Sequence, residues 1–114
     1  MAGPIVLSNI EVATNSDILQ GTRLQTVPQG GYLTFELQAS ANDASNFYTV
    51  STQMPNGDTP LNEVRMPGGV TQGGINNNDK LQITLPVAQG GHTVFSCVET
   101  GTAQLTWRVT YTPA

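Results

Sequence analysis

The sequence predicts an all-β fold, a single-domain jelly roll or a related antiparallel β-sandwich. Apolar and polar residues alternate along several short segments, as they do in strands with one buried and one solvent-facing side. Turn-forming residues separate these segments at intervals of about 8–14 residues, a spacing typical of sandwiches. No stretch keeps a 3.6-residue apolar period for three turns, so no long helix is expected.

Three segments alternate most clearly and are predicted as strands with one core-facing side. Their apolar positions are Leu33, Phe35, Leu37 and Ala39 in the first, Leu81, Ile83 and Leu85 in the second, and Leu105, Trp107, Val109 and Tyr111 in the third. Tyr48, Val50 and Met54 indicate a fourth strand. Residues 94–98 are apolar on both faces, which predicts a more fully buried strand. Residues 5–12, 22–27 and 61–66 are weaker candidates.

Glycine pairs and one Asn-Gly step mark the expected turns. Gly-Gly pairs occur at residues 30–31, 68–69, 73–74 and 90–91, and Pro55-Asn56-Gly57-Asp58 predicts a hairpin because Asn-Gly favours a two-residue turn. Asn15, Ser16 and Asp17 could cap a helical turn, which Gly21 would end early. We divide the chain into an N-terminal segment, residues 1–14, and a β-sandwich domain, residues 15–114. The first segment is either the first strand or an arm that pairs with a neighbour's sheet.

The low charge of the chain argues against binding to nucleic acid or membranes. Only 11% of residues are charged, the net charge is -4, and the four cations, Arg23, Arg65, Lys80 and Arg108, are spread along the sequence. No run approaches the length of a membrane span, and the first residues do not resemble a signal peptide. The chain is therefore expected to be made in a reducing cytosol and to remain soluble.

The sequence contains no convincing catalytic or metal-binding motif, so we expect a protein that is not an enzyme and needs no cofactor. His92 is the only imidazole, and a triad with Ser96 and Asp79 lacks a nucleophile-elbow motif. His92 is instead expected to be a solvated residue beside a turn. Cys97 is expected to be a buried small hydrophobe. Residues 76–79 offer oxygen ligands without the spacing of a calcium loop and are predicted as a polar turn.

Several segments of the chain resemble the small decoration, or cement, proteins of tailed-phage heads. The resemblance begins in residues 15–28, Asn-Ser-Asp-Ile-Leu-Gln-Gly-Thr-Arg-Leu-Gln-Thr-Val-Pro, and continues in the alternating segment 32–37. It extends through the acidic turn 78–81 to the closing segment 101–113, which ends at Pro113. Residues 42–74 have no counterpart in that pattern.

This resemblance implies a jelly roll that binds the outer surface of a viral shell and stabilises contacts between major capsid proteins. The implied partners are the major capsid protein and further copies of the chain, with a homotrimer favoured over a dimer. The candidate contacts lie in the least regular segments: Ile5, Val6, Leu7, Ile10, Asn56, Gly68, Gly69, Gly73 and Gly74. Two alternatives stay open. The first is another virion part, such as a tail or coat component. The second is a carbohydrate-binding module in which exposed Tyr32 and Tyr48 would stack on sugars, although Trp107 is expected in the core.

Overall fold

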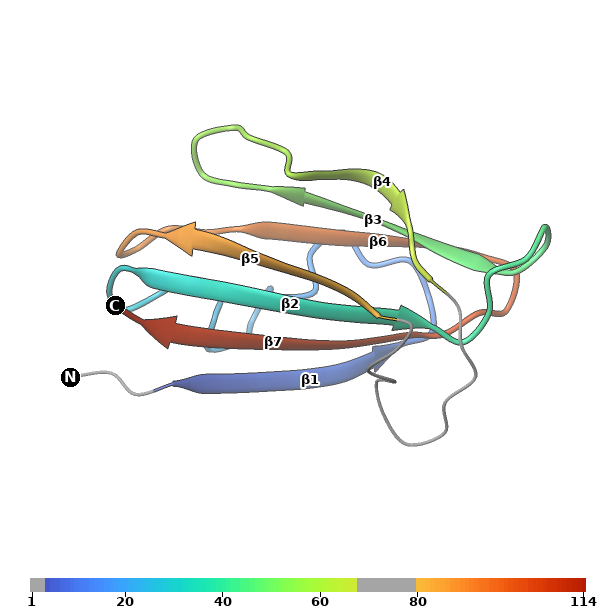
Figure 1. The fold of residues 1–114 in the computed structure, drawn as a ribbon, viewed down its shortest axis with the longest axis horizontal. Coiled ribbons are helices and arrows are strands. Elements are labelled where there is room, and N and C mark those ends of the chain that lie inside the picture. Colours follow the sequence, from blue (N-terminus) through green and yellow to red (C-terminus); the bar gives the residue numbers. More distant parts are fainter. Residues whose placement is uncertain (1–3, 68–79) are drawn as a thin grey trace.

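The computed structural model describes residues 4–67 and 80–114, and within them the chain forms two antiparallel β-sheets (Figure 1). One sheet has four strands in the order β1-β7-β2-β5, and the other has three in the order β4-β3-β6. The strand bounds are β1 Ile5–Glu11, β2 Gly31–Ala39, β3 Phe47–Gln53, β4 Leu61–Arg65, β5 Leu81–Val87, β6 Val94–Thr100 and β7 Leu105–Pro113. The predicted all-β sandwich is confirmed.

The strand order is that of a jelly roll whose second strand is almost absent. A jelly roll has eight strands in two sheets, which hold strands one, eight, three and six and strands two, seven, four and five. If the second strand is left out and the others are renumbered, these sheets become β1-β7-β2-β5 and β6-β3-β4, the orders observed here. The second strand would lie between β1 and β2 in the chain and beside β6 in space.

Residues 12–30 occupy the place of this missing strand, but they form turns rather than a strand. Only Asn15 pairs with β6, through an antiparallel bridge in which Asn15 and Cys97 exchange both backbone hydrogen bonds. The Ile18 N–H then donates to the Phe95 carbonyl. The strand predicted at residues 22–27 is therefore wrong, because that part of the chain follows tight turns. Ile18 still covers the core between the sheets.

The core lies between the two sheets and is built from the inward positions of the alternating strands. Phe35 of β2 and Phe95 of β6 stack across the interface, with ring centroids 5.0 Å apart. Trp107 is 3% exposed, which confirms its predicted core position. The phenol of Tyr111 is also buried, and its hydroxyl donates to the Gln29 carbonyl.

Three further expectations need correction. Residues 94–98 are not buried on both faces: Phe95 and Cys97 point into the core, whereas Val98 on the opposite side of β6 is 49% exposed. Tyr48 is buried, and its hydroxyl donates to the Glu11 carbonyl, so it does not present a ring to solvent. The turn at Gly57, which has a φ of 92°, is present, but residues 54–60 form a longer loop than the two-residue hairpin expected.

Candidate functional site: the outer face of the four-stranded sheet

The side of the β1-β7-β2-β5 sheet that points away from the core, here called the outer face, is rich in hydroxyl and amide groups. The register places Thr34 of β2 between Thr84 of β5 and Thr110 of β7, and the Thr34 and Thr84 hydroxyl oxygens are 3.0 Å apart. The same side carries Ser8, Tyr32, Gln82, Pro86, Thr106 and Thr112. Uncharged hydroxyls and amides can form hydrogen bonds to a partner without the cost of desolvating ions.

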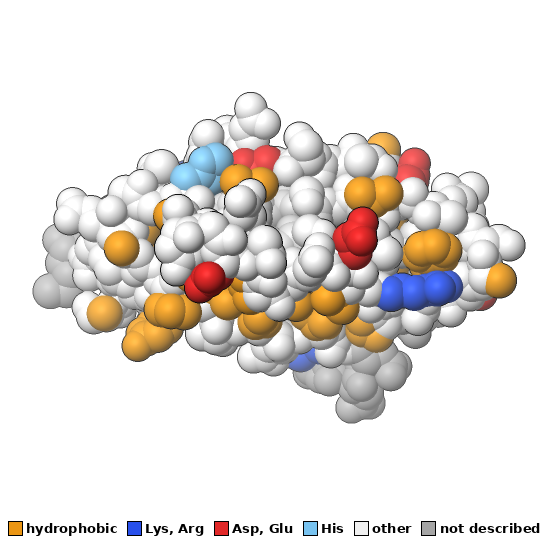
Figure 2. All heavy atoms as spheres, turned by 90° about the horizontal axis from the view of Figure 1, so that it is seen from above, with side chains coloured by type: hydrophobic (Ala, Val, Ile, Leu, Met, Phe, Trp, Pro, Cys, Tyr) orange, Lys and Arg blue, Asp and Glu red, His pale blue; other side chains and the backbone are white. Residues whose placement is uncertain are grey.

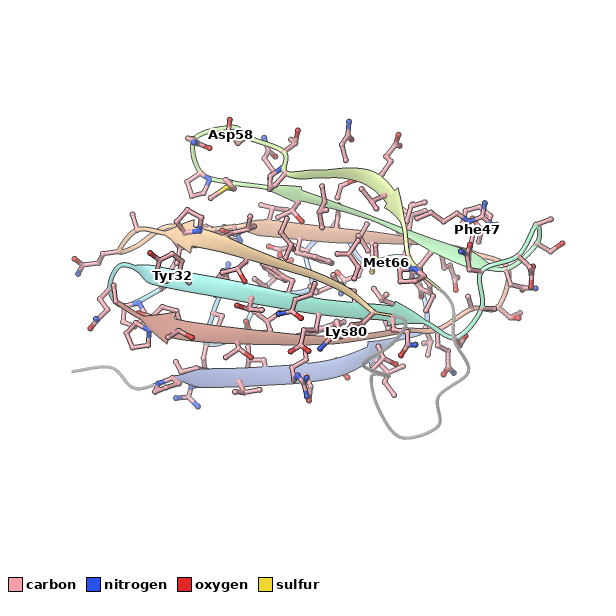
Figure 3. All side chains as sticks on the ribbon, in the orientation of Figure 1. Tyr32, Phe47, Asp58, Met66 and Lys80 are labelled. Atoms are coloured by element: carbon pink, nitrogen blue, oxygen red, sulfur yellow. The ribbon has the colours of Figure 1, made fainter. Side chains whose placement is uncertain are left out.

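The charged side chains of the outer face form hydrogen bonds and ion pairs with one another. Glu36 is 7% exposed and accepts two hydrogen bonds from the Arg108 guanidinium, at 2.8 and 2.7 Å, and one from Lys80 at 2.5 Å. These bonds, led by those from Arg108, lower the pKa of Glu36 from 4.5 to about 2 against the opposing effect of burial. The bonds to Glu36 raise the pKa of Arg108. Figure 3 shows Tyr32 toward the end of the sheet where β2 begins and Lys80 nearer the end where β5 begins.

Apolar side chains also reach solvent on the outer face. Val6 and Ile10 of β1 are 57% and 51% exposed, and Tyr32 of β2 is 49% exposed. Figure 2 shows an adjoining side of the molecule, where uncharged polar groups and backbone predominate, apolar patches are visible and charged side chains are few. Aromatic and aliphatic side chains surrounded by hydrogen-bonding groups are the usual composition of a protein interface.

A shallow, mostly apolar hollow lies beside the outer face, where the loop between β3 and β4 meets the end of β5. Its volume is about 400 Å³, and it is lined by Met54, Pro55, Asn56, Pro86, Val87 and Ala88. The Asn56 side chain is exposed and bonds Asp58 twice, donating to its carboxylate at 3.1 Å and accepting from its N–H at 3.0 Å. Figure 3 shows Asp58 at the tip of this loop.

The predicted contact residues do not form one patch. Val6 and Ile10 are exposed on β1, whereas Ile5 and Leu7 alternate with them and pack against the core. Asn56 lies beside β5, which is the opposite edge of the sheet from β1 (Figure 1). Gly68, Gly69, Gly73 and Gly74 lie outside the described residues. Their roles as contacts, and the division of the chain at residues 14 and 15, stay predictions.

The side chains considered for catalysis are engaged elsewhere or buried. His92 is not a free solvated side chain, because its Nε2 lies 2.9 Å from Asp17 Oδ2 in a half-buried pair. The Ser96 hydroxyl donates to the Ser51 carbonyl at 3.4 Å. Asp79 and the polar turn at residues 76–79 lie outside the described residues. Cys97 is fully buried, as expected, and burial raises the pKa of its thiol to about 11.

The described residues also lack two other kinds of feature. Residues 4–67 and 80–114 contain no group of three or more His, Cys, Asp or Glu side chains that could hold a metal ion. Nor do they contain a helix long and apolar enough to cross a membrane.

The sequence pattern did not predict the contacts of Glu36 with Arg108 and Lys80, or the contact of His92 with Asp17. The alternation places Glu36 and Arg108 each on the solvent side of a strand, but they are 72 residues apart and become neighbours only because β2 and β7 pair in the middle of the sheet. His92 and Asp17 are 75 residues apart and come from loops. A local alternation pattern does not contain strand order, so it gave no signal for either contact.

No family model and no curated protein matches the sequence. Two solved structures show a distant likeness. One is a chain in the acidic stable capsid structure of Helicobacter pylori bacteriophage KHP30, with 13% identity, coverage of 95% of this chain and 91% of that chain, and a TM-score of 0.45. The other is the CBM22-1 xylan-binding domain of Paenibacillus barcinonensis Xyn10C, with 10% identity, coverage of 98% and 87%, and a TM-score of 0.32. At these TM-scores neither likeness assigns a function.

Proposed function

We propose that the chain is a non-enzymatic structural protein of a viral particle, a decoration protein that lies on the outer surface of the capsid. It contacts the major capsid protein and stabilises the junctions between capsid subunits. Two observations support this role. The sequence pattern of several segments between residues 15 and 113 resembles that of phage decoration proteins, and the outer face has the composition of a protein-binding surface.

The outer face carries the proposal. Its threonine hydroxyls offer hydrogen bonds, its buried Glu36 is already neutralised by Arg108 and Lys80, and Tyr32 offers an exposed ring. A partner that covers such a face does not leave the Glu36 carboxylate buried without cationic partners. A small domain bound at many equivalent capsid sites also needs only modest affinity at each, provided that linked copies bind together.

The test is co-sedimentation with capsid shells assembled from the major capsid protein of the same virus, before and after expansion. We expect saturable binding to expanded shells. Tyr32→Ala and Thr84→Arg, two changes at exposed positions of the outer face, should weaken it. Thr100→Arg, at an exposed position of β6 in the other sheet, serves as the matched control and should bind like the unmodified chain.

Two results would overturn the proposal. One is a folded protein that fails to sediment with either form of shell, and the other is binding that survives both changes on the outer face. If the same protein pelleted with an insoluble polysaccharide and lost that binding in Tyr32→Ala, the carbohydrate-binding alternative would replace it. The exposed Tyr32 ring beside Pro86 is the observation that favours this alternative. Rings or tubes in negative stain would indicate a tail component.

A further inference from the structure

The strand β1 is an edge strand that is apolar on both of its sides. Ile5 and Leu7 face inward against the core, and Val6 and Ile10 face outward into solvent. The outward row continues at both ends with Pro4 and Val12, which are also exposed. Strands with apolar residues on both sides are normally covered on both, and exposed edges usually carry charges, bulges or proline as protection.

The edge of β1 has little of this protection beyond Pro4, which directly precedes the strand and has no N–H to donate. It pairs with β7 through seven consecutive positions without a register shift, so no bulge twists the edge away. Its only charged residue is Glu11, at the last position of the strand. The described part of the chain provides no further strand beyond β1, because β1 ends the order of its sheet.

The backbone groups on this edge belong to the even-numbered residues. The N–H of Ile10 donates to Asn9 Oδ1 at 2.8 Å, a side-chain acceptor, rather than to a carbonyl of β7. Because backbone groups point alternately to the two sides of a strand, the N–H and C=O groups of Val6 and Ser8 also point away from β7. The same residues therefore provide both the free backbone edge and the exposed apolar row.

We propose that a second copy of the chain pairs with this edge, antiparallel and about a two-fold axis at Ser8. In this register even-numbered residues face even-numbered residues, so their outward backbone groups can bond across the axis. The Ile10 N–H exchanges its bond to Asn9 Oδ1 for one to the partner subunit, and Pro4 contributes only its carbonyl. The smallest side chain of the strand then meets its own copy at the axis. The other outward pairs are Val6 with Ile10 of the partner subunit and Pro4 with Val12 of the partner subunit. Every outward pair apart from Ser8 is apolar on both sides.

The charges also favour a second copy in this register. Each Glu11 faces Ile5 of the partner subunit, so the two like charges lie at opposite ends of the paired strands. An isologous contact of this kind needs one surface to complement itself, and it closes at two subunits. The pairing joins two four-stranded sheets into one and extends the outer face across both copies. This inference does not depend on the proposed capsid function.

Sedimentation velocity of the purified full chain, over a range of concentrations, tests the pairing. We expect a monomer–dimer equilibrium. The double change Val6→Lys/Ile10→Lys puts like charges directly opposite each other and should raise the dimer dissociation constant at least about tenfold. Val6→Lys/Ile10→Glu puts opposite charges at the same positions and should restore the dimer. Val98→Lys, at an exposed valine of the other sheet, is the matched control and should leave the dimer unchanged.

The register is tested by Ser8→Cys, which should give a disulfide-linked dimer under mild oxidation, because the two Ser8 residues form a hydrogen-bonded pair, in which opposite Cα atoms are about 5.5 Å apart. The native Cys97 is buried and should not compete. Circular dichroism establishes that each variant is folded. A protein that stays monomeric at high concentration, a trimer, or a dimer that persists in the folded Val6→Lys/Ile10→Lys variant would overturn the proposal.

Discussion

Replacing Glu36 by glutamine should make the stability of the protein less dependent on pH in the acid range. In the folded chain, Arg108 and Lys80 hold the pKa of Glu36 at about 2, below its ordinary value of 4.5. A carboxylate with a lowered pKa stabilises the fold above its unfolded pKa, and this stabilisation is lost as the pH falls through the folded pKa. The contribution of Glu36 is therefore complete above about pH 5 and disappears by about pH 2.

The difference between the two pKa values corresponds to about 3 kcal/mol, at about 1.4 kcal/mol for each pH unit. Because the Arg108 side chain is 43% exposed, solvent screening reduces the expected value to about 2 kcal/mol. Glu36→Gln should lose this amount at pH 7, since the amide keeps the shape of the side chain but cannot balance the two cations.

Urea unfolding of the unmodified chain and of Glu36→Gln, measured at intervals from pH 7 to pH 2.5, gives the free energy of unfolding of each. The difference between the two proteins should shrink as the pH falls, because Glu36 becomes protonated in the unmodified chain. Other carboxylates titrate in both proteins and cancel in the difference. A difference that stayed constant from pH 7 to pH 2.5 would refute the reasoning, because it would assign the loss to packing rather than to charge.

Four further outcomes follow from single features of the structure. Trp107→Ala should lower the free energy of unfolding by about 3–5 kcal/mol, because the ring is buried, and a near-neutral result would place it at the surface. Gly101→Ala should cost more than Gly57→Ala in the same unfolding assay, because both glycines have a positive φ but only at Gly101 would a Cβ lie 2.2 Å from the Ser45 carbonyl oxygen. The Cys97 thiol, with its pKa raised to about 11, should not react with a thiol reagent at pH 8 until the chain is unfolded. Deleting residues 1–12 should lower the midpoint of thermal unfolding, because β1 pairs with β7; an unchanged midpoint would show that β1 is a dispensable arm.

Local sequence pattern was sufficient to predict the central strands. Leu33, Phe35 and Leu37 of β2 alternate with polar residues and occupy the middle of a sheet, so burial and pattern agree. The pattern failed for the outward side of β6. Residues 94–98 were predicted to be buried on both faces, yet Val98 is exposed, because hydrophobic residues alone do not show which sides of a strand a neighbour will cover.

The sequence predicts which residue types make up the candidate site, but it does not predict how they are brought together. The threonine-rich solvent sides of β2, β5 and β7 are visible in the sequence, but their union into one surface depends on the order β7-β2-β5. The same is true of Glu36, which reads as an ordinary exposed carboxylate until β7 places Arg108 beside it. Long-range pairing therefore determines both the electrostatics and the extent of the outer face.

Residues 12–30 form turns in the place of the second jelly-roll strand. As a result, the edge strand β6 of one sheet and the edge strand β1 of the other are covered to different extents. On the three-stranded sheet, residues 14–18 cover part of β6: Asn15 bridges Cys97, Ile18 bonds Phe95, and the Thr14 hydroxyl accepts from the N–H of Glu99. Turns of the chain's own N-terminal region thus occupy backbone groups that a neighbouring strand would otherwise find free. On the four-stranded sheet β1 has no such cover among the described residues. If strand addition occurs in this protein, β1 is therefore a more accessible edge than β6, and the exposed apolar row of Val6 and Ile10 lies on that same strand.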